Sequence, residues 1–422
     1  MCSELLRIPV EWHGVPIFGV GVLLAVWLLG GGLALVYSGK QTGWSAETWG
    51  YLPGLLLGVV GIVFAARLFP EGLPIRGYGV MVLTGSVTAL WMVIHRARQV
   101  GLSSEVILSL AFGLFICGIL GARLFYVIEY WDTRFQFDDW STTLLEIVKF
   151  TEGGLVFYGS MIGGAIAYVV LARRLHLPAL ALADLIAPSL LVGLAFGRLG
   201  CLLNGCCYGG ETDKRWAVTF PPGSILYMEQ ASIGRMCSLR VGPLDEDDPR
   251  PVVESVDENS SAAKAGVHSG MKIARINGRR VNDLAETRQE LFLAFDSGRS
   301  LRLETDAGQA FELPVSRPPR SRPVHPTQIY SSTGAALLAW LLWSFYPYRR
   351  RDGEVVALMV LLYPITRFLL EIIRIDESAV FGTGLSISQN ISVVLFIAAI
   401  AFWVYLWNQP PEKASFSFDT SR

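Results

Sequence analysis

The chain has 422 residues, of which 52% are hydrophobic and only 17% are charged, and its mean hydropathy is +0.44. This composition is too apolar for a soluble enzyme of this length and indicates a polytopic membrane protein. The formal net charge of −1 gives no reason to expect a nucleic-acid partner.

Nine apolar stretches are candidates for membrane spans, because a transmembrane helix needs about 20 mostly apolar residues. The predicted spans are 16–38, 51–69, 76–94, 105–129, 155–172, 179–203, 328–347, 354–373 and 387–407. The residues before the first span contain no basic region, and no small-residue cleavage site follows it. We therefore predict no removable signal peptide.

Basic residues predict the orientation. When nine spans alternate, the loops that contain Arg96 and Arg98, Arg173 and Arg174, and Arg349–Arg351 all lie on one face. That face should be cytoplasmic, together with the tail 409–422. The N-terminus and the segments 131–153, 204–326 and 375–386 then lie outside, which in a bacterium is the periplasmic side of the inner membrane.

Several spans carry polar residues near their predicted external ends. Arg76 precedes Tyr78, Arg123 follows Gly121-Ala122, and Tyr158 stands at the start of the fifth span. A charged side chain at the centre of a span costs from about 2.5 kcal/mol upward. Arg76 and Arg123 lie close enough to the helix ends to snorkel, so an interfacial role and a site role both remain open.

The sixth span ends in the segment 197–211, which contains five glycines, Arg198, Asn204 and three cysteines. The six cysteines of the chain are too few and too scattered for a disulfide framework, and Cys206-Cys207 lacks the C-x-x-C spacing of a metal site. We interpret Cys201, Cys206 and Cys207 as small packing residues. We expect neither a metal nor an organic cofactor.

A soluble insert separates the sixth and seventh spans. The sequence predicts a strand at 252–256, a turn and short helix at 260–267, two strands around the Asn277-Gly278 turn, a helix at 287–295 and a strand at 301–305. This order resembles a bacterial extracytoplasmic PDZ domain over 245–318, with Met271 where that family usually has Asp. PDZ domains bind a peptide as an added strand. Peptide capture and a rigid spacer are both open here.

Arg367, Glu371 and Arg374 are spaced i, i+4 and i+7, so we predict that they share one helix face. Arginines that converge from different spans need an anion, and a lipid phosphate is the anion present at that depth. Glu371 and Arg374 could also pair only with each other. Arg198 and Arg367 lie deeper in their apolar runs, where an unpaired charge costs most.

These motifs together resemble the prolipoprotein diacylglyceryl transferase family. The resemblance covers about 73–224 and 324–406 and rests on motifs in a fixed order. They are Arg76-x-Tyr78-Gly79, Gly121-Ala122-Arg123, Gly153-Gly154, Gly197-Arg198-Leu199-Gly200 with Asn204-Gly205 and Gly209, Phe220-Pro221, His325–Tyr330 and Arg367-x-x-x-Glu371-x-x-Arg374.

The resemblance implies transfer of the diacylglyceryl group of phosphatidylglycerol to the thiol of a prolipoprotein's lipobox cysteine, with release of glycerol phosphate. It implies that Arg198 and Arg367 hold the phosphate and that Asn204, Tyr78 and Gly209 contact the substrate. Glu371 and Arg374 would support them. Positive charge on the phosphate oxygens lowers the barrier to carbon–oxygen cleavage, and a base helps the thiol ionise.

This chain departs from the family's pattern at the position of the base. Where the best-known members have a histidine after an aromatic residue, this chain has Tyr158. Since tyrosine has an unperturbed pKa of about 10, it needs nearby arginines to act as a base. Glu152, Glu211 or His325 could serve instead, or the thiol could ionise unaided. Cys201 and Cys206 also replace an amide and a carboxylate.

The predicted fold is an all-α polytopic membrane protein with a small α+β PDZ-like domain between spans six and seven. Its parts are an extension with two spans (1–72), the transferase core (73–224 and 324–408), the insert (245–318) and the tail (409–422). An intramembrane protease is excluded as the main hypothesis because none of the five histidines begins an HExxH motif. An inactive lipid- or lipoprotein-binding scaffold remains the alternative.

Overall fold

The computed structural model describes residues 4–17, 21–43, 52–136, 139–149, 153–245, 248–374, 379–380, 382–414 and 416. The chain folds as two compact units. The first unit contains residues 1–80, 203–205 and 220–320, and the second contains 81–202, 206–219 and 321–422. Two long helices, α4 (Gly77–Gln99) and α9 (Ala179–Asn204), contribute residues to both units.

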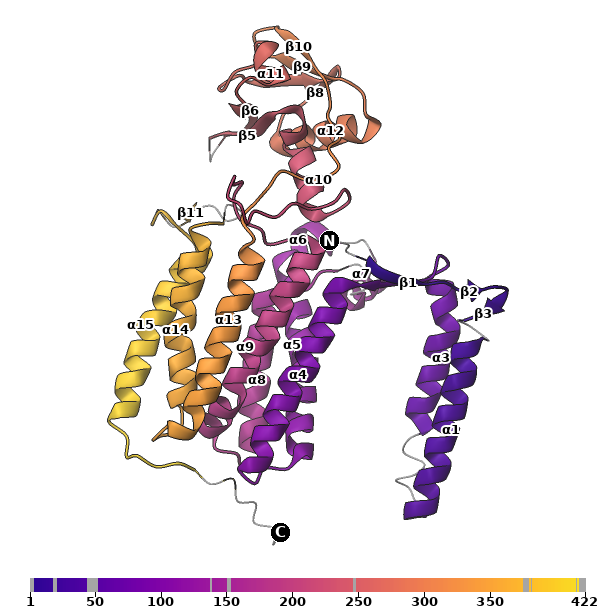
Figure 1. Cartoon of the computed structure of the whole chain (residues 1–422), viewed down its shortest axis with the longest axis vertical. Coiled ribbons are helices and arrows are strands. Elements are labelled where there is room, and N and C mark those ends of the chain that lie inside the picture. The colour runs from indigo at the N-terminus through magenta and orange to yellow at the C-terminus, as the bar shows by residue number, and fades with distance from the viewer. Residues whose placement is uncertain are drawn as a thin grey trace. The chain divides into compact units, whose positions relative to one another are not determined.

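The second unit consists mainly of long helices that run side by side (Figure 1). Helix α5 packs against α8, α13 against α14, and α14 against α15. The bounds are α5 Ser104–Glu129, α6 Trp131–Arg134, α7 Trp140–Val148, α8 Phe157–Arg174, α13 Thr327–Phe345, α14 Glu354–Glu371 and α15 Ile387–Trp407. Each span predicted in this part of the sequence therefore overlaps a helix.

Five of the described helices are long and apolar enough to cross a membrane, namely α1 (Val22–Thr42), α4, α5, α9 and α15. Helices α8, α13, α14 and α3 (Leu52–Leu68) have 17 to 19 residues and also overlap predicted spans. The chain is thus a mostly helical, multi-pass membrane protein. The count of nine spans stays a prediction.

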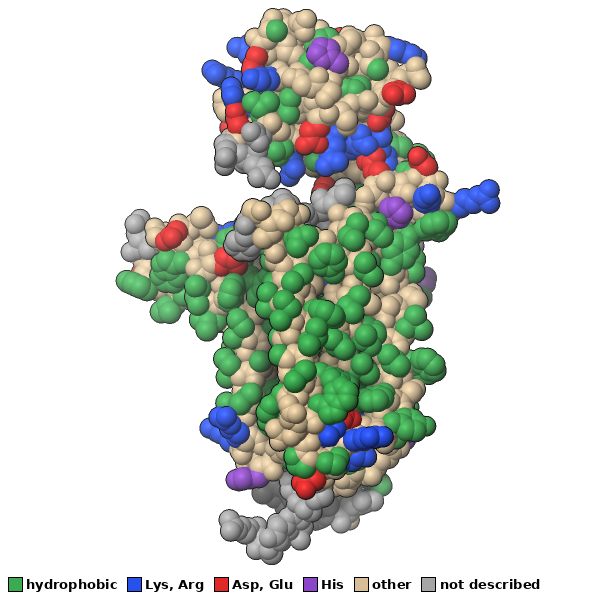
Figure 2. All heavy atoms as spheres, turned by 90° about the vertical axis from the view of Figure 1, so that its left-hand side faces the viewer, with side chains coloured by type: hydrophobic (Ala, Val, Ile, Leu, Met, Phe, Trp, Pro, Cys, Tyr) green, Lys and Arg blue, Asp and Glu red, His purple; other side chains and the backbone are tan. Residues whose placement is uncertain are grey.

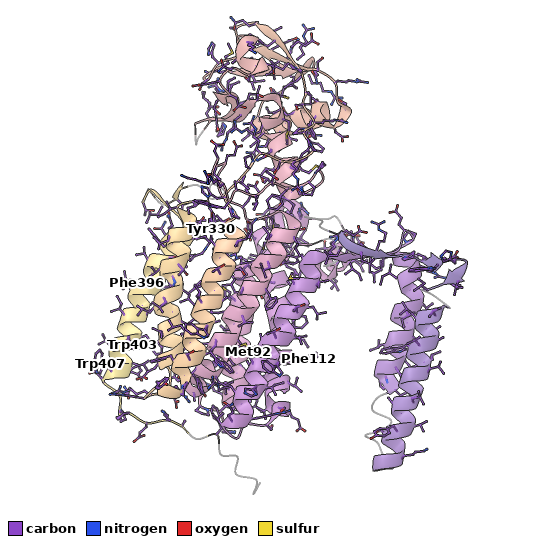
Figure 3. All side chains as sticks on the ribbon, viewed as in Figure 1. Met92, Phe112, Tyr330, Phe396, Trp403 and Trp407 are labelled. Atoms are coloured by element: carbon purple, nitrogen blue, oxygen red, sulfur yellow. The ribbon has the colours of Figure 1, made fainter. Side chains whose placement is uncertain are left out.

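The helices of the second unit expose their apolar side chains, as expected of a surface that faces lipid. Phe112 on α5 is 67% exposed, and Trp407 at the end of α15 is 70% exposed. Hydrophobic side chains cover the long sides of these helices (Figure 2), and Phe112, Trp403 and Trp407 project from them (Figure 3). In water this surface would drive aggregation, so a bilayer is its physical context.

Glycines let α5 and α8 pack closely. A Cβ atom on Gly121 would lie 2.4 Å from the Gly159 carbonyl oxygen and 2.9 Å from the Gly163 Cα atom. Small residues at such crossings replace the hydrophobic driving force that is missing between helices in lipid. This packing fixes the start of α8, where Tyr158 lies.

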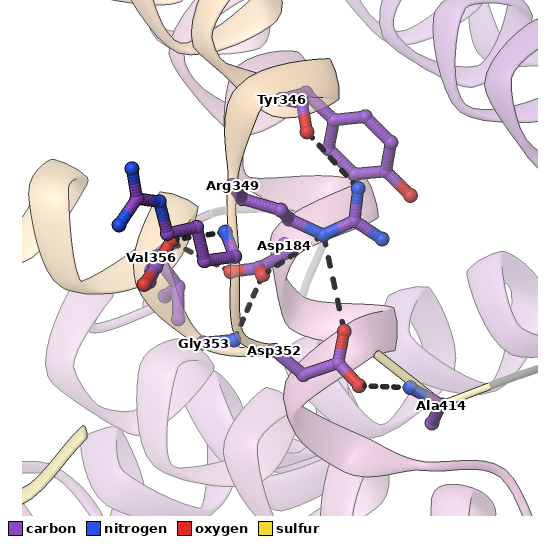
Figure 4. A network of polar contacts seen from close by, with 9 residues as sticks. Asp184, Tyr346, Arg349, Asp352, Gly353, Val356 and Ala414 are labelled. Atoms are coloured by element: carbon purple, nitrogen blue, oxygen red, sulfur yellow. Dashed lines mark hydrogen bonds and ion pairs between the residues drawn. The ribbon is translucent and has the colours of Figure 1, made fainter. Parts of the chain in front are cut away.

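A buried charge network ties α9 to the start of α14 (Figure 4). Asp184 is completely buried and accepts hydrogen bonds from the backbone amides of Gly353 (2.8 Å) and Val356 (2.9 Å). The Arg349 Nε atom lies 3.5 Å from an Asp184 oxygen and 3.8 Å from an Asp352 oxygen. The guanidinium also stacks on Tyr346, 3.8 Å from the ring centroid. Asp184 therefore caps α14 and has a buried cationic partner.

The insert forms strands and helices where the sequence predicts them. Strand β6 (Asp248–Val256), helix α11 (Ser261–Lys264), strands β7 (Ile273–Ile276) and β8 (Arg279–Arg280), helix α12 (Leu284–Ser297) and strand β9 (Leu301–Thr305) confirm the predicted order. The larger sheet has the order β10-β9-β7-β8, and Leu239, Ile276 and Leu301 are fully buried in the core. The PDZ assignment itself stays a prediction.

Three elements of this region were not predicted. They are α10 (Ile225–Ser232), β5 (Leu239–Asp245) and β10 (Ala310–Leu313). Strand β5 pairs with β6 and contributes Leu239 and Val241 to the core, so the core begins before the predicted boundary at residue 245. Strand β5 was not predicted because its Gly242-Pro243 pair is typical of turns.

The N-terminal extension contains a pair of packed helices, α1 and α3. Gly31 faces Leu55, and the Trp27 indole donates a hydrogen bond to the Leu55 carbonyl oxygen (3.0 Å). The helix starts at Val22 rather than at the predicted residue 16, because β2 (Glu11–Trp12) and β3 (Val15–Pro16) form a hairpin. Before it, β1 (Glu4–Ile8) pairs with β4 (Leu73–Arg76).

Candidate active site

The segment that follows α9 folds back on the end of that helix. Gly205 and Cys207 have left-handed backbone angles (φ 74° and 58°), and the Cys206 amide donates to the Cys201 carbonyl oxygen (3.1 Å). The left-handed region costs a non-glycine residue about 1 kcal/mol or more. Because the chain turns back here, the sulfur atoms of Cys201, Cys206 and Cys207 all lie within 4.8 Å of one another. The sequence indicates packing residues at these three positions and does not predict that their sulfur atoms come together.

The start of α13 holds this loop. The Thr327 hydroxyl donates to the Cys207 carbonyl oxygen (2.7 Å), and the Gln328 amide donates to the Cys206 carbonyl oxygen (2.7 Å). Both side chains are 1% exposed. The motif His325–Tyr330 therefore positions the loop through buried side chains.

Gly209 joins three segments of the chain. Its amide donates to the His325 carbonyl oxygen (3.0 Å), and the next amide, of Gly210, donates to the Ile373 carbonyl oxygen (2.9 Å). A Cβ atom on Gly209 would lie 2.8 Å from both His325 Cβ and Thr327 Cγ2. Only glycine fits this close approach. This gives Gly209 a packing role, and its contact with substrate stays a prediction.

His325 has a local partner. Its Nδ1 atom lies 3.4 Å from the Tyr330 hydroxyl, which accepts a hydrogen bond from the Trp216 indole (2.7 Å). Tyr330 lies near the start of α13 (Figure 3). Of the other residues considered as bases, Glu211 lies 3.8 Å from an Arg322 nitrogen, whereas Glu152 lies outside the described residues.

Arg367, Glu371 and Arg374 form one charged cluster, although only Arg367 and Glu371 share a helix face and the prediction that Arg374 lies on the same helix is wrong. Arg367 Nη1 lies 2.9 Å and Arg374 Nε 3.8 Å from the same Glu371 oxygen, and Glu371 is 5% exposed. Arg367 Nη2 also donates to the Ser388 hydroxyl at the start of α15 (2.8 Å). Helix α14 ends at Glu371, so Arg374 reaches the carboxylate from the turn after the helix. One buried carboxylate thus orients two guanidinium groups.

Arg198 and Arg374 both act on the cysteine loop. The pKa of the Cys207 thiol is lowered, first by hydrogen bonds from Cys201 and Cys206 and then by the positive charges of Arg198 and Arg374, although burial opposes the shift. Arg198, near the end of α9, and Arg374, beyond α14, therefore lie in one electrostatic neighbourhood. The convergence of Arg198 and Arg367 on one phosphate stays a prediction.

Arg123 has neither of the roles considered from the sequence. Its guanidinium donates hydrogen bonds to the carbonyl oxygens of Glu146, Ile147, Lys149, Gly153 and Gly154 at 2.5–3.2 Å. These five bonds use all five N–H donors of the side chain. Arg123 therefore fixes the chain that leads into α8.

Tyr158 is the second residue of α8, and it is 44% exposed. Its ring contacts Phe157 at a centroid distance of 6.1 Å. Within the described residues, the Tyr158 hydroxyl makes no hydrogen bond. The chain thus places this hydroxyl at an accessible helix end, and the activation of Tyr158 by an arginine stays a prediction.

Tyr78 and Asn204 both belong to the first compact unit. A Cβ atom on Gly77 would lie 2.9 Å from Leu203 Cδ1, so the start of α4 packs against the last turn of α9. Tyr78 and Asn204 are the next residues along these two helices. Tyr78 and Asn204 therefore lie near each other, and their contact with substrate stays a prediction.

Comparison with known proteins adds a family. The family model of prolipoprotein diacylglyceryl transferase matches residues 69–405. The chain belongs to this family. A phosphatidylglycerol–prolipoprotein diacylglyceryl transferase of Rhodopirellula baltica is 34% identical over 96% of this chain and 89% of its own length.

Relatives of lower identity belong to the same family. The transferase of Corynebacterium glutamicum is 26% identical over 83% of this chain and 85% of its own, and a Clostridium perfringens transferase is 27% identical over 79% and 91%. The family match begins at residue 69, directly after α3, which ends at Leu68. The two helices of the extension thus precede the part that defines the family.

Proposed function

We infer that this transferase moves the diacylglyceryl group of phosphatidylglycerol to the cysteine thiol of a prolipoprotein and releases glycerol phosphate. In this reaction the thiol sulfur attacks the glycerol carbon next to the phosphate. The carbon–oxygen bond breaks, and its electron pair leaves on the phosphate oxygen. The barrier depends on how well that departing charge is stabilised.

The charged cluster Arg367–Glu371–Arg374 is the observation that carries this proposal. Among the described residues, it contains two guanidinium groups and one buried carboxylate, so these three side chains together have a positive formal charge. A guanidinium group can donate two hydrogen bonds to phosphate oxygens at once. It loses little entropy on binding when a carboxylate has already oriented it. In our proposal Arg367 and Arg198 hold the phosphate, while Glu371 and Arg374 support them.

An apolar groove on the same helix as Arg367 supports a lipid substrate. The groove has a volume of about 270 Å³ and lies between α14 and α15, lined by Pro364, Ile365, Phe368, Leu369, Ser392, Val393 and Phe396. Its lining flanks Arg367 in sequence and is almost wholly apolar. An apolar wall of this kind suits the acyl chain of a lipid.

We assign the remaining predicted residues to the headgroup and the thiol. Tyr78 and Asn204, which lie at adjoining helix ends, contact the glycerol headgroup, and Gly209 shapes the wall near it. Tyr158 has the position that the family resemblance gives to the base. It is the sequence-based candidate for taking the thiol proton.

The topology belongs to the proposal as well. Nine spans would place the N-terminus and the loop 204–326 outside and the tail 409–422 inside, with the site at the outer leaflet of the bacterial inner membrane. The tail would then share the side of the basic loops at Arg173–Arg174 and Arg349–Arg351. The insert would be periplasmic.

The insert is proposed to be PDZ-like and to bind an extended prolipoprotein segment. Strand β8 has two residues and forms one edge of the four-stranded sheet, where a peptide strand could add. Because α10 packs on α12, a clean deletion should remove residues 225–318. Transfer to a short lipobox peptide should survive this deletion if the insert only recruits long substrates. Loss of short-peptide transfer in a folded deletion variant would contradict recruitment.

Incubation of the purified protein with phosphatidylglycerol vesicles and a lipobox peptide tests the function. The peptide mass should increase by one diacylglyceryl group, whereas a peptide with serine in place of the cysteine should remain unchanged. If wild-type protein leaves the cysteine peptide unmodified where a histidine-bearing relative modifies it, the inactive-scaffold alternative is correct.

A further inference from the structure

The thiol cluster at the end of α9 has the composition of a metal site. The sulfur atoms of Cys201, Cys206 and Cys207 lie within 4.8 Å of one another, and all three residues are partly accessible and outside any disulfide among the described residues. A tetrahedral zinc ion with bonds of about 2.3 Å to sulfur holds its ligands about 3.8 Å apart. Small side-chain rotations therefore suffice to bring the three sulfurs to one ion.

The backbone around the cluster is fixed in a way that packing alone does not require. Cys207 adopts a left-handed conformation (φ 58°), and its sulfur atom lies within 4.8 Å of the Cys201 sulfur atom. The carbonyl groups of Cys206 and Cys207 are bound by the buried side chains of Gln328 and Thr327. These bonds hold the backbone from which two of the three sulfur ligands project.

Three thiolates select a soft or borderline ion, and zinc is the one that also performs Lewis-acid chemistry without changing its oxidation state. Structural zinc sites have four protein ligands, whereas catalytic sites have three and an open fourth position. The described residues supply three sulfur ligands here. The ligand number thus favours a catalytic site.

We propose that Cys201, Cys206 and Cys207 bind one zinc ion and that its fourth position takes the lipobox thiol of the prolipoprotein. The proposal rests on the transferase function and extends it. Zinc binding ionises the thiol, and its proton passes to water. The sulfur then bonds to the glycerol carbon, the carbon–oxygen bond breaks, and glycerol phosphate leaves with the electron pair.

A zinc site would explain how the substrate thiol ionises although Tyr158 replaces the usual histidine. A tyrosine is a weak base near neutral pH, and the Tyr158 hydroxyl makes no hydrogen bond within the described residues. Zinc removes the need for a base because it lowers the pKa of the thiol that it binds. The same loop connects to the charged cluster, since the Gly210 amide donates to the Ile373 carbonyl oxygen between Glu371 and Arg374.

Metal analysis of the full-length protein, purified under reducing conditions, tests the binding. About one zinc ion per chain is expected in wild-type protein and in the matched control Cys117→Ser, whose cysteine lies on α5. The triple variant Cys201→Ser/Cys206→Ser/Cys207→Ser should lose at least about nine-tenths of the metal. Equal zinc in wild-type and triple-variant protein, or a disulfide and no metal in wild-type protein, overturns the proposal.

Cobalt substitution tests the fourth position without turnover and without a variant that must fold. Wild-type protein is stripped with a chelator and reloaded with cobalt, whose visible absorption reports ligand identity. A lipobox peptide should change this spectrum in the absence of lipid, and its cysteine-to-serine analogue should leave it unchanged. Identical spectra with both peptides would show that the thiol does not reach the metal.

Turnover separates this inference from the proposed function. Chelated wild-type protein should transfer at least about tenfold more slowly, and zinc should restore the rate. Full transfer by metal-free protein would refute the zinc mechanism and leave the transferase function intact. A metal-loaded protein that shifts its spectrum with the thiol peptide but transfers nothing would refute the function while the metal site stood.

Discussion

Two charged networks lie in the second compact unit, and they differ in their numbers of carboxylates and arginines. Around Asp184, two carboxylates share one arginine, and backbone amides at the start of α14 supply the remaining bonds. Around Glu371, one carboxylate lies between two arginines at the other end of α14. In the first network carboxylates outnumber arginines, and backbone amides bind both oxygens of Asp184. In the part of the chain that the structure describes, the second network has more arginines than carboxylates, which suits an anionic ligand.

The Asp184 network should govern stability. Asp184→Ala leaves Arg349 buried and the first amides of α14 without their acceptor, so the expected loss is about 3–5 kcal/mol of unfolding free energy. Thermal unfolding in detergent measures it. The rate per folded molecule should stay within about threefold of wild type. A stable but inactive Asp184→Ala protein would show that the comparison assigns the two networks wrongly.

The Glu371 network should govern turnover. Arg367→Ala is expected to lower the transfer rate about 10²–10³-fold, the effect of removing one donor from a developing oxyanion. Arg367→Lys should recover only part of the rate because it keeps the charge and loses the fork. Transfer kinetics and the unfolding temperature are measured together. If Arg367→Ala lowers the unfolding temperature as much as Asp184→Ala does, its role is structural.

Tyr158→Phe distinguishes the two possible origins of the thiolate. A base at this position contributes about 10²–10⁴-fold, whereas a thiol ionised by zinc predicts a loss of less than about tenfold. The pH dependence of the rate provides a second readout, because loss of an essential base would remove one limb of the profile. A large loss with normal zinc content would return the proton transfer to Tyr158.

Glu371→Gln should have a moderate effect, because the amide still accepts a hydrogen bond from Arg367 but no longer orients both guanidinium groups by charge. We expect about a tenfold loss of kcat with little change in KM. Steady-state kinetics over a range of lipid concentrations measures the split. An unchanged kcat would mean that Arg367 is held by Ser388 and its other neighbours alone.

The helices were predictable because lipid imposes long apolar segments, and all nine predicted stretches overlap a described helix. The Arg367–Glu371 pair was predictable for a similar reason, since its spacing of four residues needs only a helix. Arg374 was harder to place, because α14 ends at Glu371 and a turn brings Arg374 back.

The thiol cluster was beyond sequence reasoning because it depends on a turn. Cys201 and Cys206 are five positions apart, and a continuing helix would have pointed Cys206 and Cys207 in different directions. The left-handed angles at Gly205 and Cys207 decide the outcome, and non-glycine residues rarely adopt them. Arg123 likewise looked like a site or interfacial residue, because the five carbonyl groups that it binds lie 23–31 positions away.

The central claim is that phosphate departs when the carbon–oxygen bond breaks, with arginines stabilising its charge. The position of an oxygen isotope after transfer tests most directly which bond breaks. Phosphatidylglycerol is labelled with oxygen-18 at the oxygen atom that bridges the diacylglyceryl carbon and the phosphorus. The masses of the products of transfer to a lipobox peptide are then measured. Carbon–oxygen cleavage predicts that all the label appears in glycerol phosphate and none in the peptide. Label that stays on a diacylglycerol product, with no gain of mass by the peptide, would contradict the account.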